Sequence, residues 1–336
     1  MEIAVKKPIL VTGGSGHLGF IICKQLKELG YNTRVLIRSK SCLSYLGPFA
    51  DEVYYGDVTD LESMKKASYG VDFVIHSAAL ITIGHEKKKE LYKVNVSGTM
   101  NVVDACLQNS VKRLVYVSSA YALGFKTKDE ILSERDYYDP DLVHSNYAKS
   151  KAISSSFVLG VDQSKLQTIV CMPTGIIGPY AYRGSHLGKF LELIHKRKMP
   201  CSLKGSYNFV DVRDTASAII NALSAPSSGR SYLIGGENMT IDEILEFIGE
   251  RAKIKTPKIK CPLFVIRAVA PFIELGGTIT HKNPLFTGNA VKVLNGNDHF
   301  DCSRAISELN LKNRPARESL YEHYCFVNHL EEFSSK

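Results

Sequence analysis

The chain has 336 residues, of which 44% are hydrophobic and 23% are charged, and it contains 25 glycines, 12 prolines and no tryptophan. This composition excludes a disordered, collagen-like or low-complexity protein, and the length allows one large domain or two domains that share a surface. The 42 lysines and arginines exceed the 34 aspartates and glutamates, but they are spread along the chain, so the net charge of +8 does not by itself indicate a nucleic-acid partner.

Short β-branched runs alternate with longer segments of helical periodicity in the first half of the chain. Residues 8–12 are the first expected strand. Apolar residues from Leu18 to Leu29 then recur every three or four positions, which predicts a helix, and Gly30 follows where a helix cap is expected. Further strands are predicted at 33–37, 53–55, 73–75, 114–117 and 168–172. This alternation is typical of a doubly wound α/β fold with a parallel sheet.

The alternation weakens after Pro173. Residues 175–199 indicate a loop followed by a helix, residues 208–214 return to a strand and a helix start, and the chain is mainly helical from Thr240 onward. We therefore expect a first domain at 1–174, to which 207–230 return. A smaller, mainly helical C-terminal lobe is expected from 175–206 and 231–336.

The eight cysteines are far apart, with no Cys-x-x-Cys pair and no Cys/His cluster, so no metal site is expected and the thiols are interpreted as buried and reduced. The N-terminus lacks the apolar core of a signal peptide. The longest apolar stretch, 263–275, is interrupted by Arg267 and is too short for a transmembrane segment. These features predict a cytoplasmic protein, with peripheral membrane contact through 263–275 as a minor alternative.

A glycine-rich turn joins the first strand to the first helix. Residues 12–19 read TGGSGHLG, and their glycines have the spacing of a pyrophosphate-binding turn placed between a strand and an amphipathic helix. In such a turn, backbone N–H groups and the helix N-terminus face the phosphates. The expected cofactor contacts are Gly13, Ser15, Gly16, His17, Leu18 and Gly19. The alternative is a plain glycine loop that closes a strand–helix unit.

The second strand ends without the carboxylate that would accept a hydrogen bond from the ribose of NAD. It ends instead in Arg38, followed by Ser39, and an arginine can hold a 2′-phosphate, so NADP(H) is preferred and NAD(H) is the alternative. Asp57, followed by Val58, ends the next strand on the same sheet edge. Its side chain is expected either to meet the adenine or to cap the helix that begins near Leu61.

Tyr147 and Lys151 are four residues apart, so on a helix they share one face. An ammonium near a phenol favours the phenolate and lowers its pKa, which makes the tyrosine a usable proton donor or acceptor near neutrality. A buried-type strand at 114–117 ends just before Ser118 and Ser119, which places a hydroxyl at the edge of the sheet where the glycine turn lies.

Together these motifs resemble the extended short-chain dehydrogenase/reductase family in order and spacing over nearly the whole chain. The resemblance is carried by residues 12–19, 57–58, 76–79, Asn95, 118–120, 147–151 and 209–214. Within that family, Arg38 and residues 173–175 and 233–238 most resemble the dihydroflavonol reductase-like branch, which also contains 3β-hydroxysteroid dehydrogenase-like proteins. The resemblance implies a Rossmann domain followed by a lobe for the substrate.

The resemblance also implies roles for individual residues. Ser119, Tyr147 and Lys151 are the expected catalytic serine, tyrosine and lysine: Tyr147 exchanges a proton with the substrate oxygen, Ser119 hydrogen-bonds that oxygen, and Lys151 holds the nicotinamide ribose. Further expected cofactor contacts are Ser77, Ala78, Ala79, Asn95, Val117, Pro173, Thr174, Gly175, Ile176 and Ser185. No acidic pair follows Ser119, which disfavours a dehydratase.

Aromatic side chains fall in the segments that surround the substrate pocket in this family. Tyr121, Phe125, Tyr180 and Tyr182, together with His186, are the expected substrate contacts, although aromatic residues also fill cores. The predicted function is an NADP(H)-dependent oxidoreductase that interconverts a ketone or aldehyde and an alcohol of apolar, aromatic or steroid-like character. The alternatives are a sugar-nucleotide epimerase with retained NAD(P) and a non-catalytic NADP sensor. We expect a homodimer or monomer and no nucleic-acid partner.

Overall fold

The structure is a computed structural model that describes residues 7–81, 88–124, 130–257, 259–261 and 298–330. Seven parallel strands form the main sheet in the order β10-β6-β5-β4-β1-β2-β3. They are β1 (Ile9–Thr12), β2 (Thr33–Ile37), β3 (Glu52–Tyr55), β4 (Phe73–His76), β5 (Arg113–Val117), β6 (Gln167–Pro173) and β10 (Arg230–Ile234). The strand order reverses between β1 and β4, and crevices at the carboxyl ends of strands are the usual ligand sites at such a point.

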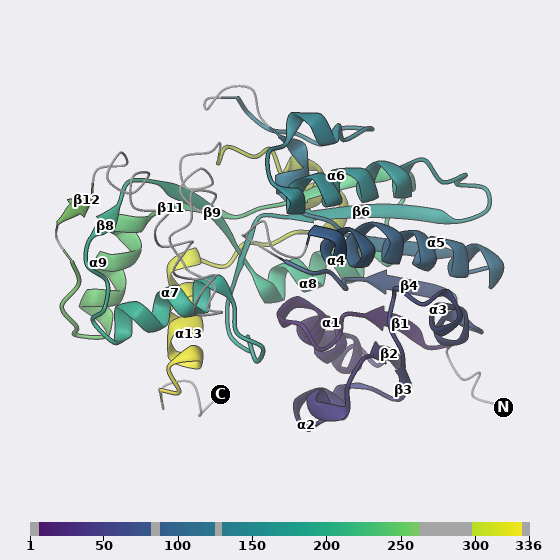
Figure 1. Ribbon diagram of the computed structural model, residues 1–336, viewed down its shortest axis with the longest axis horizontal. Coiled ribbons are helices and arrows are strands. Elements are labelled where there is room, and N and C mark those ends of the chain that lie inside the picture. Colours follow the sequence, from purple (N-terminus) through teal and green to yellow (C-terminus); the bar gives the residue numbers. More distant parts are fainter. Residues whose placement is uncertain (1–6, 82–87, 125–129, 258, 262–297, 331–336) are drawn as a thin grey trace.

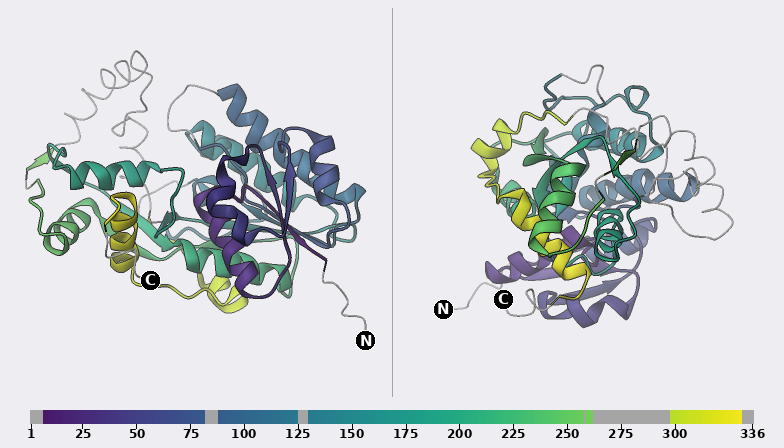
Figure 2. Two further views of the ribbon diagram at one scale, coloured as in Figure 1. Left: turned by 90° about the horizontal axis from the view of Figure 1, so that it is seen from below. Right: turned by 90° about the vertical axis from the view of Figure 1, so that its left-hand side faces the viewer.

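Helices cover both faces of this sheet (Figure 2). One face packs on α1 (His17–Glu28), α2 (Leu43–Leu46), α8 (Val212–Asn221) and α12 (Ser303–Leu309). The other packs on α3 (Leu61–Ser68), α5 (Gly98–Gln108) and α6 (Asn146–Leu159), with the short α4 (Lys88–Tyr92) beside α6. Neighbouring strand residues enter opposite cores, as Val115 and Tyr116 do on β5. The predicted doubly wound fold is confirmed.

The sequence predicted six of these strands with ends that differ by at most one residue. The first helix ends at Glu28, and Gly30 follows with a φ of +76°, so it supplies the left-handed residue that closes the helix. Strand β10 was not predicted, because Arg230–Ile234 has a single β-branched residue.

The smaller lobe lies at one end of the molecule (Figure 1). It contains α7 (His186–His195), α9 (Ile241–Arg251) and α13 (Ala316–Val327), packed around a separate apolar core. It also contains two small sheets. One is built from β7 (Gly175–Ile177), β9 (Ser206–Asp211) and β11 (Glu237–Thr240), and the other from β8 (Ser202–Leu203) and β12 (Lys260–Cys261). The sequence indicated β9, within the strand and helix start expected at 208–214, but not the other four strands. Most of these strands have two to four residues, which is too short to display a period of two.

Helix α12 returns from the smaller lobe to the first domain. Ala305 and Leu309 lie fully buried in the core beneath α1 and α8. The boundaries expected between the two parts stay a prediction. Within the described ranges, none of the helices is long and apolar enough to cross a membrane. The apolar stretch at 263–275 lies outside the described residues.

Candidate active site

The glycine turn lies between β1 and α1 and has a geometry that only glycine permits. Gly13 has a φ of +77°, and a Cβ there would lie 2.6 Å from the backbone nitrogen of Ala78. A Cβ on Gly19 would lie 2.1 Å from the carbonyl oxygen of Gly13. Gly16 caps α1 without a side-chain hydrogen bond, so no cap side chain occupies the first N–H groups of the helix. These features fit a bound diphosphate.

The side chains of the turn have other partners. The Tyr45 hydroxyl donates to the carbonyl oxygen of Ser15 over 3.0 Å, and Leu18 lies in the core. His17 Nε2 lies 2.8 Å from the carbonyl oxygen of Pro179, and burial lowers the pKa of its imidazole to about 4. His17 therefore links the glycine turn to the segment that follows β7, and its backbone is the part available to a cofactor.

Arg38 and Asp57 meet at the end of β2 and β3. Their side chains are 3.8 Å apart, and the Arg38 side chain is 66% exposed, so its donors are available to a ligand. Ser39 caps the next helical turn by accepting from the Ser41 backbone. Val58 is buried and lies against Gly98. The alternative role for Asp57 as a helix cap is wrong, because Asp60 caps α3 and is one residue from its start.

The segment after β4 approaches the glycine turn closely. The Ser77 hydroxyl donates to the carbonyl oxygen of Thr12 over 2.7 Å, Ala78 lies against Gly13, and Ala79 is exposed. Asn95 is 1% exposed and bonds both backbone groups of Leu80. Its side chain also donates to Ser150 on α6, so Asn95 ties this segment to the helix that carries Tyr147.

Ser119 and Tyr147 are brought together by β5 and α6. Burial raises the pKa of Tyr147 to about 12, and the nearby Ser119 hydroxyl opposes part of this rise. The sequence predicted a pKa lowered by Lys151, and the direction found is the opposite. The reason is that burial of the phenol dominates, while the Lys151 ammonium is directed to other groups.

Lys151 is 2% exposed, and its ammonium points to the end of β5. Nζ donates to the carbonyl oxygen of Val117 over 2.7 Å and to the Tyr116 hydroxyl over 3.3 Å, and it lies 4.8 Å from the centre of the Tyr116 ring. Burial lowers the pKa of Lys151 to about 7. The sequence analysis missed Tyr116, although a tyrosine in an otherwise apolar strand signals a buried hydroxyl that needs a partner.

The residues expected near the nicotinamide form the junction between two sheets. Pro173 ends β6, the Thr174 backbone nitrogen donates to the carbonyl oxygen of Ile234, and Gly175 and Ile176 begin β7. A Cβ on Gly175 would lie 2.7 Å from the ring of Tyr207, so glycine makes room for that ring.

Tyr207 in turn contacts Tyr121, two residues after Ser119, with ring centres 6.3 Å apart. These two rings lie beside the Ser119 region. The sequence analysis missed Tyr207, because only the fold brings β9 of the smaller lobe next to Tyr121.

The other predicted substrate contacts lie elsewhere. Tyr180 and Tyr182 belong to a group of six rings, here called the aromatic cluster, which joins α1, the segment around α2, the segment after β7 and α13. Its members are Phe20, Tyr45, Phe49, Tyr180, Tyr182 and Phe326. The Tyr45 and Tyr182 rings stack with centres 4.4 Å apart. Phe125 lies outside the described residues.

Ser185 and His186 begin α7. The Ser185 hydroxyl accepts from the Gly188 backbone as the helix cap, so this hydroxyl is already used. Burial lowers the pKa of His186, and its Nδ1 is buried without a hydrogen-bond partner among the described residues. Within the part of the chain that the structure describes, neither side chain forms a hydrogen bond with Ser119 or Tyr147.

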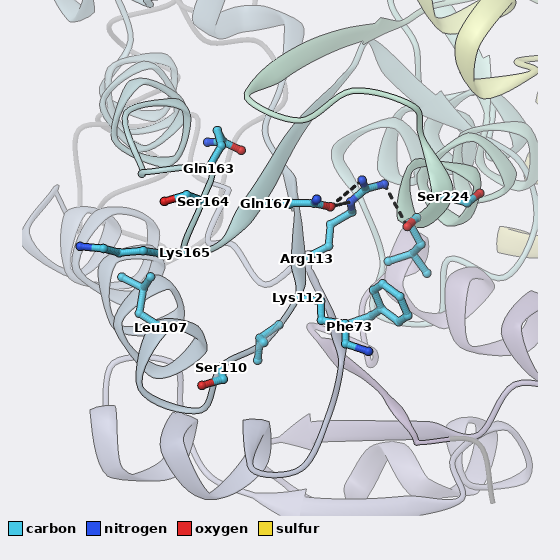
Figure 3. A pocket seen from close by; sticks show the side chains of 12 residues that line it. Phe73, Leu107, Ser110, Lys112, Arg113, Gln163, Ser164, Lys165, Gln167 and Ser224 are labelled. Atoms are coloured by element: carbon cyan, nitrogen blue, oxygen red, sulfur yellow. Dashed lines mark hydrogen bonds between the residues drawn. The ribbon is translucent and has the colours of Figure 1, made fainter. Parts of the chain in front are cut away.

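A cavity of about 970 Å³ opens at the opposite, amino edge of the sheet. Figure 3 shows Arg113 within it, directed to Gln167. The guanidinium donates to the Gln167 oxygen and to the carbonyl oxygens of Ala222, Leu223 and Ala225 over 2.7–3.2 Å. These bonds tie β5 to β6 and to the end of α8. We interpret this arginine as structural, since carbonyl oxygens of the fold occupy its donors.

Comparisons with known proteins agree with this geometry. A family model described as the NAD dependent epimerase/dehydratase family matches residues 9–235. Sterol demethylase protein B of Methylococcus capsulatus is 30% identical over 90% of this chain and 92% of its own length. A putative dihydroflavonol 4-reductase of Synechocystis is 27% identical over 97% and 96%. The crystal structure of gox2253 superposes with a TM-score of 0.83 at 26% identity, covering 96% of this chain and 98% of that one.

The glycine turn lies beside the reversal of strand order, and the helix that carries Tyr147 and Lys151 lies at the same sheet edge. These features define an extended short-chain dehydrogenase/reductase. The chain belongs to the NAD dependent epimerase/dehydratase family. It is an NAD(P)-dependent oxidoreductase of that family, as the resemblance implied.

Proposed function

We propose that the protein interconverts a ketone or aldehyde and an alcohol, uses NADP(H) in preference to NAD(H), and acts on an apolar, aromatic or steroid-like substrate. The observation that carries this proposal is the meeting of the Ser119 hydroxyl with the Tyr147 phenol at the end of β5, one helical turn from the buried Lys151. These are the groups that a carbonyl reduction requires at one place: a proton donor, a second donor to the same oxygen, and a cation nearby.

The chain's own residues supply the proton and the orientation. A bound nicotinamide supplies or accepts the hydride. Tyr147 is protonated at neutral pH because its pKa is about 12, so it can give its proton to a substrate oxygen. Ser119 hydrogen-bonds the same oxygen and fixes its position. Lys151 would hold the nicotinamide ribose, with its ammonium at the end of β5.

Three parts of the first domain would hold the cofactor. The turn at 12–19 would take the diphosphate at the start of α1, and the segment 77–79 would border the adenosine and ribose groove. Arg38 would pair with the 2′-phosphate, since its guanidinium is exposed and its contact with Asp57 is long, at 3.8 Å. The junction 173–176 would border the nicotinamide. These contacts support NADP(H) over NAD(H).

The aromatic pair of Tyr121 and Tyr207 supports an apolar substrate. Tyr121 follows Ser119 by two residues and contacts Tyr207, and both rings are partly exposed, so a flat carbonyl compound could pack against them. Relatives named for sterols and for a dihydroflavonol fit this interpretation. We further propose that the protein is cytoplasmic and acts as a homodimer or monomer.

A sugar-nucleotide epimerase with retained NAD(P) is the second candidate, because the matching family model covers epimerases. A non-catalytic sensor is disfavoured by the presence of Ser119, Tyr147 and Lys151 together. An epimerase would regenerate its cofactor within each turnover, whereas a reductase would consume NADPH. Cofactor consumption therefore separates the two candidates.

The test is a panel of apolar ketones, aldehydes and UDP-sugars, assayed for NADPH and NADH consumption. The parent is expected to consume NADPH with at least one apolar carbonyl compound, and Tyr147→Phe is expected to lose at least about 100-fold in rate. Tyr137→Phe is the control, because Tyr137 is 63% exposed and lies outside the site. An unchanged rate for Tyr147→Phe would exclude Tyr147 as the proton donor.

A further inference from the structure

Tyr116 is a polar residue in an apolar core. It lies on β5, is completely buried, and packs among the side chains beneath α3, α5 and α6. Its hydroxyl interacts with Ser154, Thr99 and Ser118 as well as with Lys151. A phenylalanine would fill the same space without a hydroxyl that needs partners, so packing alone does not explain a tyrosine here.

The ammonium of Lys151 depends on neutral acceptors. It has three N–H groups, and the recorded acceptors are the carbonyl oxygen of Val117 and the hydroxyl of Tyr116. No carboxylate forms an ion pair with Lys151 within the described part of the chain. The hydroxyl and the ring face of Tyr116 are therefore a large share of what stabilises this buried charge.

His76 supports the same ring. It ends β4 and is completely buried, and its imidazole stacks with Tyr116 at a centre distance of 5.5 Å and an angle of 29°. His76 Nδ1 lies 2.7 Å from the Thr12 hydroxyl, and Nε2 lies 3.1 Å from the Thr99 hydroxyl. These two bonds fix the plane of the imidazole and connect it to the strand that carries the glycine turn.

We propose that Tyr116 is a positioning residue for Lys151, and that His76 holds Tyr116 in place from the neighbouring strand. Tyr116 would keep the ammonium charged and at the end of β5, within one helical turn of Tyr147. This inference rests on the proposed function, because the position of Lys151 affects catalysis only if Lys151 assists Tyr147.

The titratable groups around Lys151 determine the expected direction. Tyr116 on β5, Tyr147 on α6 and His76 on β4 are all neutral near pH 7, since burial raises the pKa of both tyrosines and lowers that of His76 to about 3. A hydroxyl that accepts a hydrogen bond from the ammonium favours the charged lysine. Removing it should lower the pKa of Lys151 by about one unit.

The first readout is the pH profile of kcat/KM for carbonyl reduction by the parent, Tyr116→Phe and Tyr116→Leu. Reduction needs a charged Lys151, so activity declines as pH rises through the pKa of Lys151. Tyr116→Phe should move this decline to lower pH by about one unit and keep most of the rate at acidic pH, and Tyr116→Leu, which also loses the ring, should move it further. A uniform loss at every pH, or a profile that superimposes on the parent, would overturn the proposal.

The second readout does not need catalysis. In protein labelled with ¹³C at the lysine Cε, the Lys151 signal is assigned by its loss in Lys151→Met, and its titration is compared between the parent and Tyr116→Phe. Tyr232→Phe is the matched control, because Tyr232 is also a buried tyrosine of the main sheet but donates to Glu308. Melting temperatures show whether each variant folds.

We expect a lower titration midpoint in Tyr116→Phe and an unchanged one in Tyr232→Phe. The two proposals can then fail separately. If Lys151 titrates as in the parent while reduction is observed, the positioning role is wrong and the proposed function stands. If the midpoint shifts but no carbonyl compound is reduced, the contact between Tyr116 and Lys151 stands and the proposed function is wrong.

Discussion

Two buried cations lie at opposite edges of the same sheet. Arg113 at the amino edge is 8% exposed and donates to four oxygen atoms of the fold. Lys151 at the carboxyl edge is 2% exposed and has two recorded acceptors. Desolvation lowers the pKa of both, but only that of Lys151 reaches about 7. Burial is thus similar, and the number of bonded donors separates a structural cation from a candidate functional one.

The comparison is tested most strongly by replacing Lys151 with methionine. We expect carbonyl reduction to fall by about 1,000-fold, because the cation proposed to hold the nicotinamide ribose is lost. The free energy of unfolding should stay unchanged or rise, since a poorly compensated buried charge is removed. Chemical denaturation and steady-state rates measure the two effects. Lys149→Met, two residues away and partly exposed, is the control, and strong destabilisation by Lys151→Met alone would contradict the contrast.

Arg113→Met should show the reverse behaviour. The change leaves the carbonyl oxygens at the end of α8 without their donor, so we expect a loss of about 3 kcal/mol in the free energy of unfolding. The rate per folded molecule should be unchanged. Arg230→Met is the control, because the Arg230 side chain is 49% exposed and pairs at the surface with Glu308. If Arg113→Met kept the stability of the parent but reduced carbonyls more slowly, Arg113 would be a functional residue and not a structural one.

His323 extends the comparison to a neutral ring. It is buried, and neither of its ring nitrogens has a hydrogen-bond partner among the described residues. Burial lowers its pKa to about 3, below the usual 6.5. As pH falls below 6.5 the unfolded chain gains a proton there and the folded chain does not, so stability is lost between pH 6.5 and about 3.

The corresponding variant is His323→Phe. The difference in free energy of unfolding between His323→Phe and the parent should shift in favour of the variant by about 2 kcal/mol as pH falls from 7.5 to 5. Urea denaturation at both pH values measures this shift. The exposed His144 provides the control substitution His144→Phe. Equal pH dependence in the parent and His323→Phe would show that the folded protein accommodates a charged imidazole.

Arg38 is exposed, unlike the buried Lys151, Arg113 and His323, and its substitution should have the smallest effect of the four on the protein. Arg38→Ser is expected to weaken NADPH binding by about tenfold and to leave NADH binding unchanged, because only NADPH carries the 2′-phosphate. Fluorescence titration with each dinucleotide measures this, with Lys40→Ser as a neighbouring control. An equal loss for both cofactors would contradict a phosphate-specific role.

The sequence predicted the first domain well because its signals are local. Periodic residues such as those of α1, the positive-φ glycines and the short β-branched strands each report on their own segment. The smaller lobe was predicted less fully, since β7 and β11 are short and acquire their structure by pairing with β9 across a long separation. Long-range pairing leaves little trace in a single segment.

The candidate site divides in the same way. Spacing placed Tyr147 and Lys151 on one helix, but the direction of the Lys151 ammonium depends on Tyr116, which belongs to a different element. The pKa of Tyr147 was predicted in the wrong direction because its main cause, burial of the phenol, depends on the packed fold. Tyr207 was missed because only the fold brings it to Tyr121. Side-chain contacts between distant segments are what the sequence could not provide.

The aromatic cluster affects the cooperativity of unfolding. Its rings belong to both the first domain and the smaller lobe, and Tyr45 also bonds the backbone of the glycine turn. Because they share these rings, the first domain and the smaller lobe should unfold in a single calorimetric transition, even though each has a core of its own. A substitution that weakens this interface, for example one that removes the Tyr182 ring, should split that transition into two.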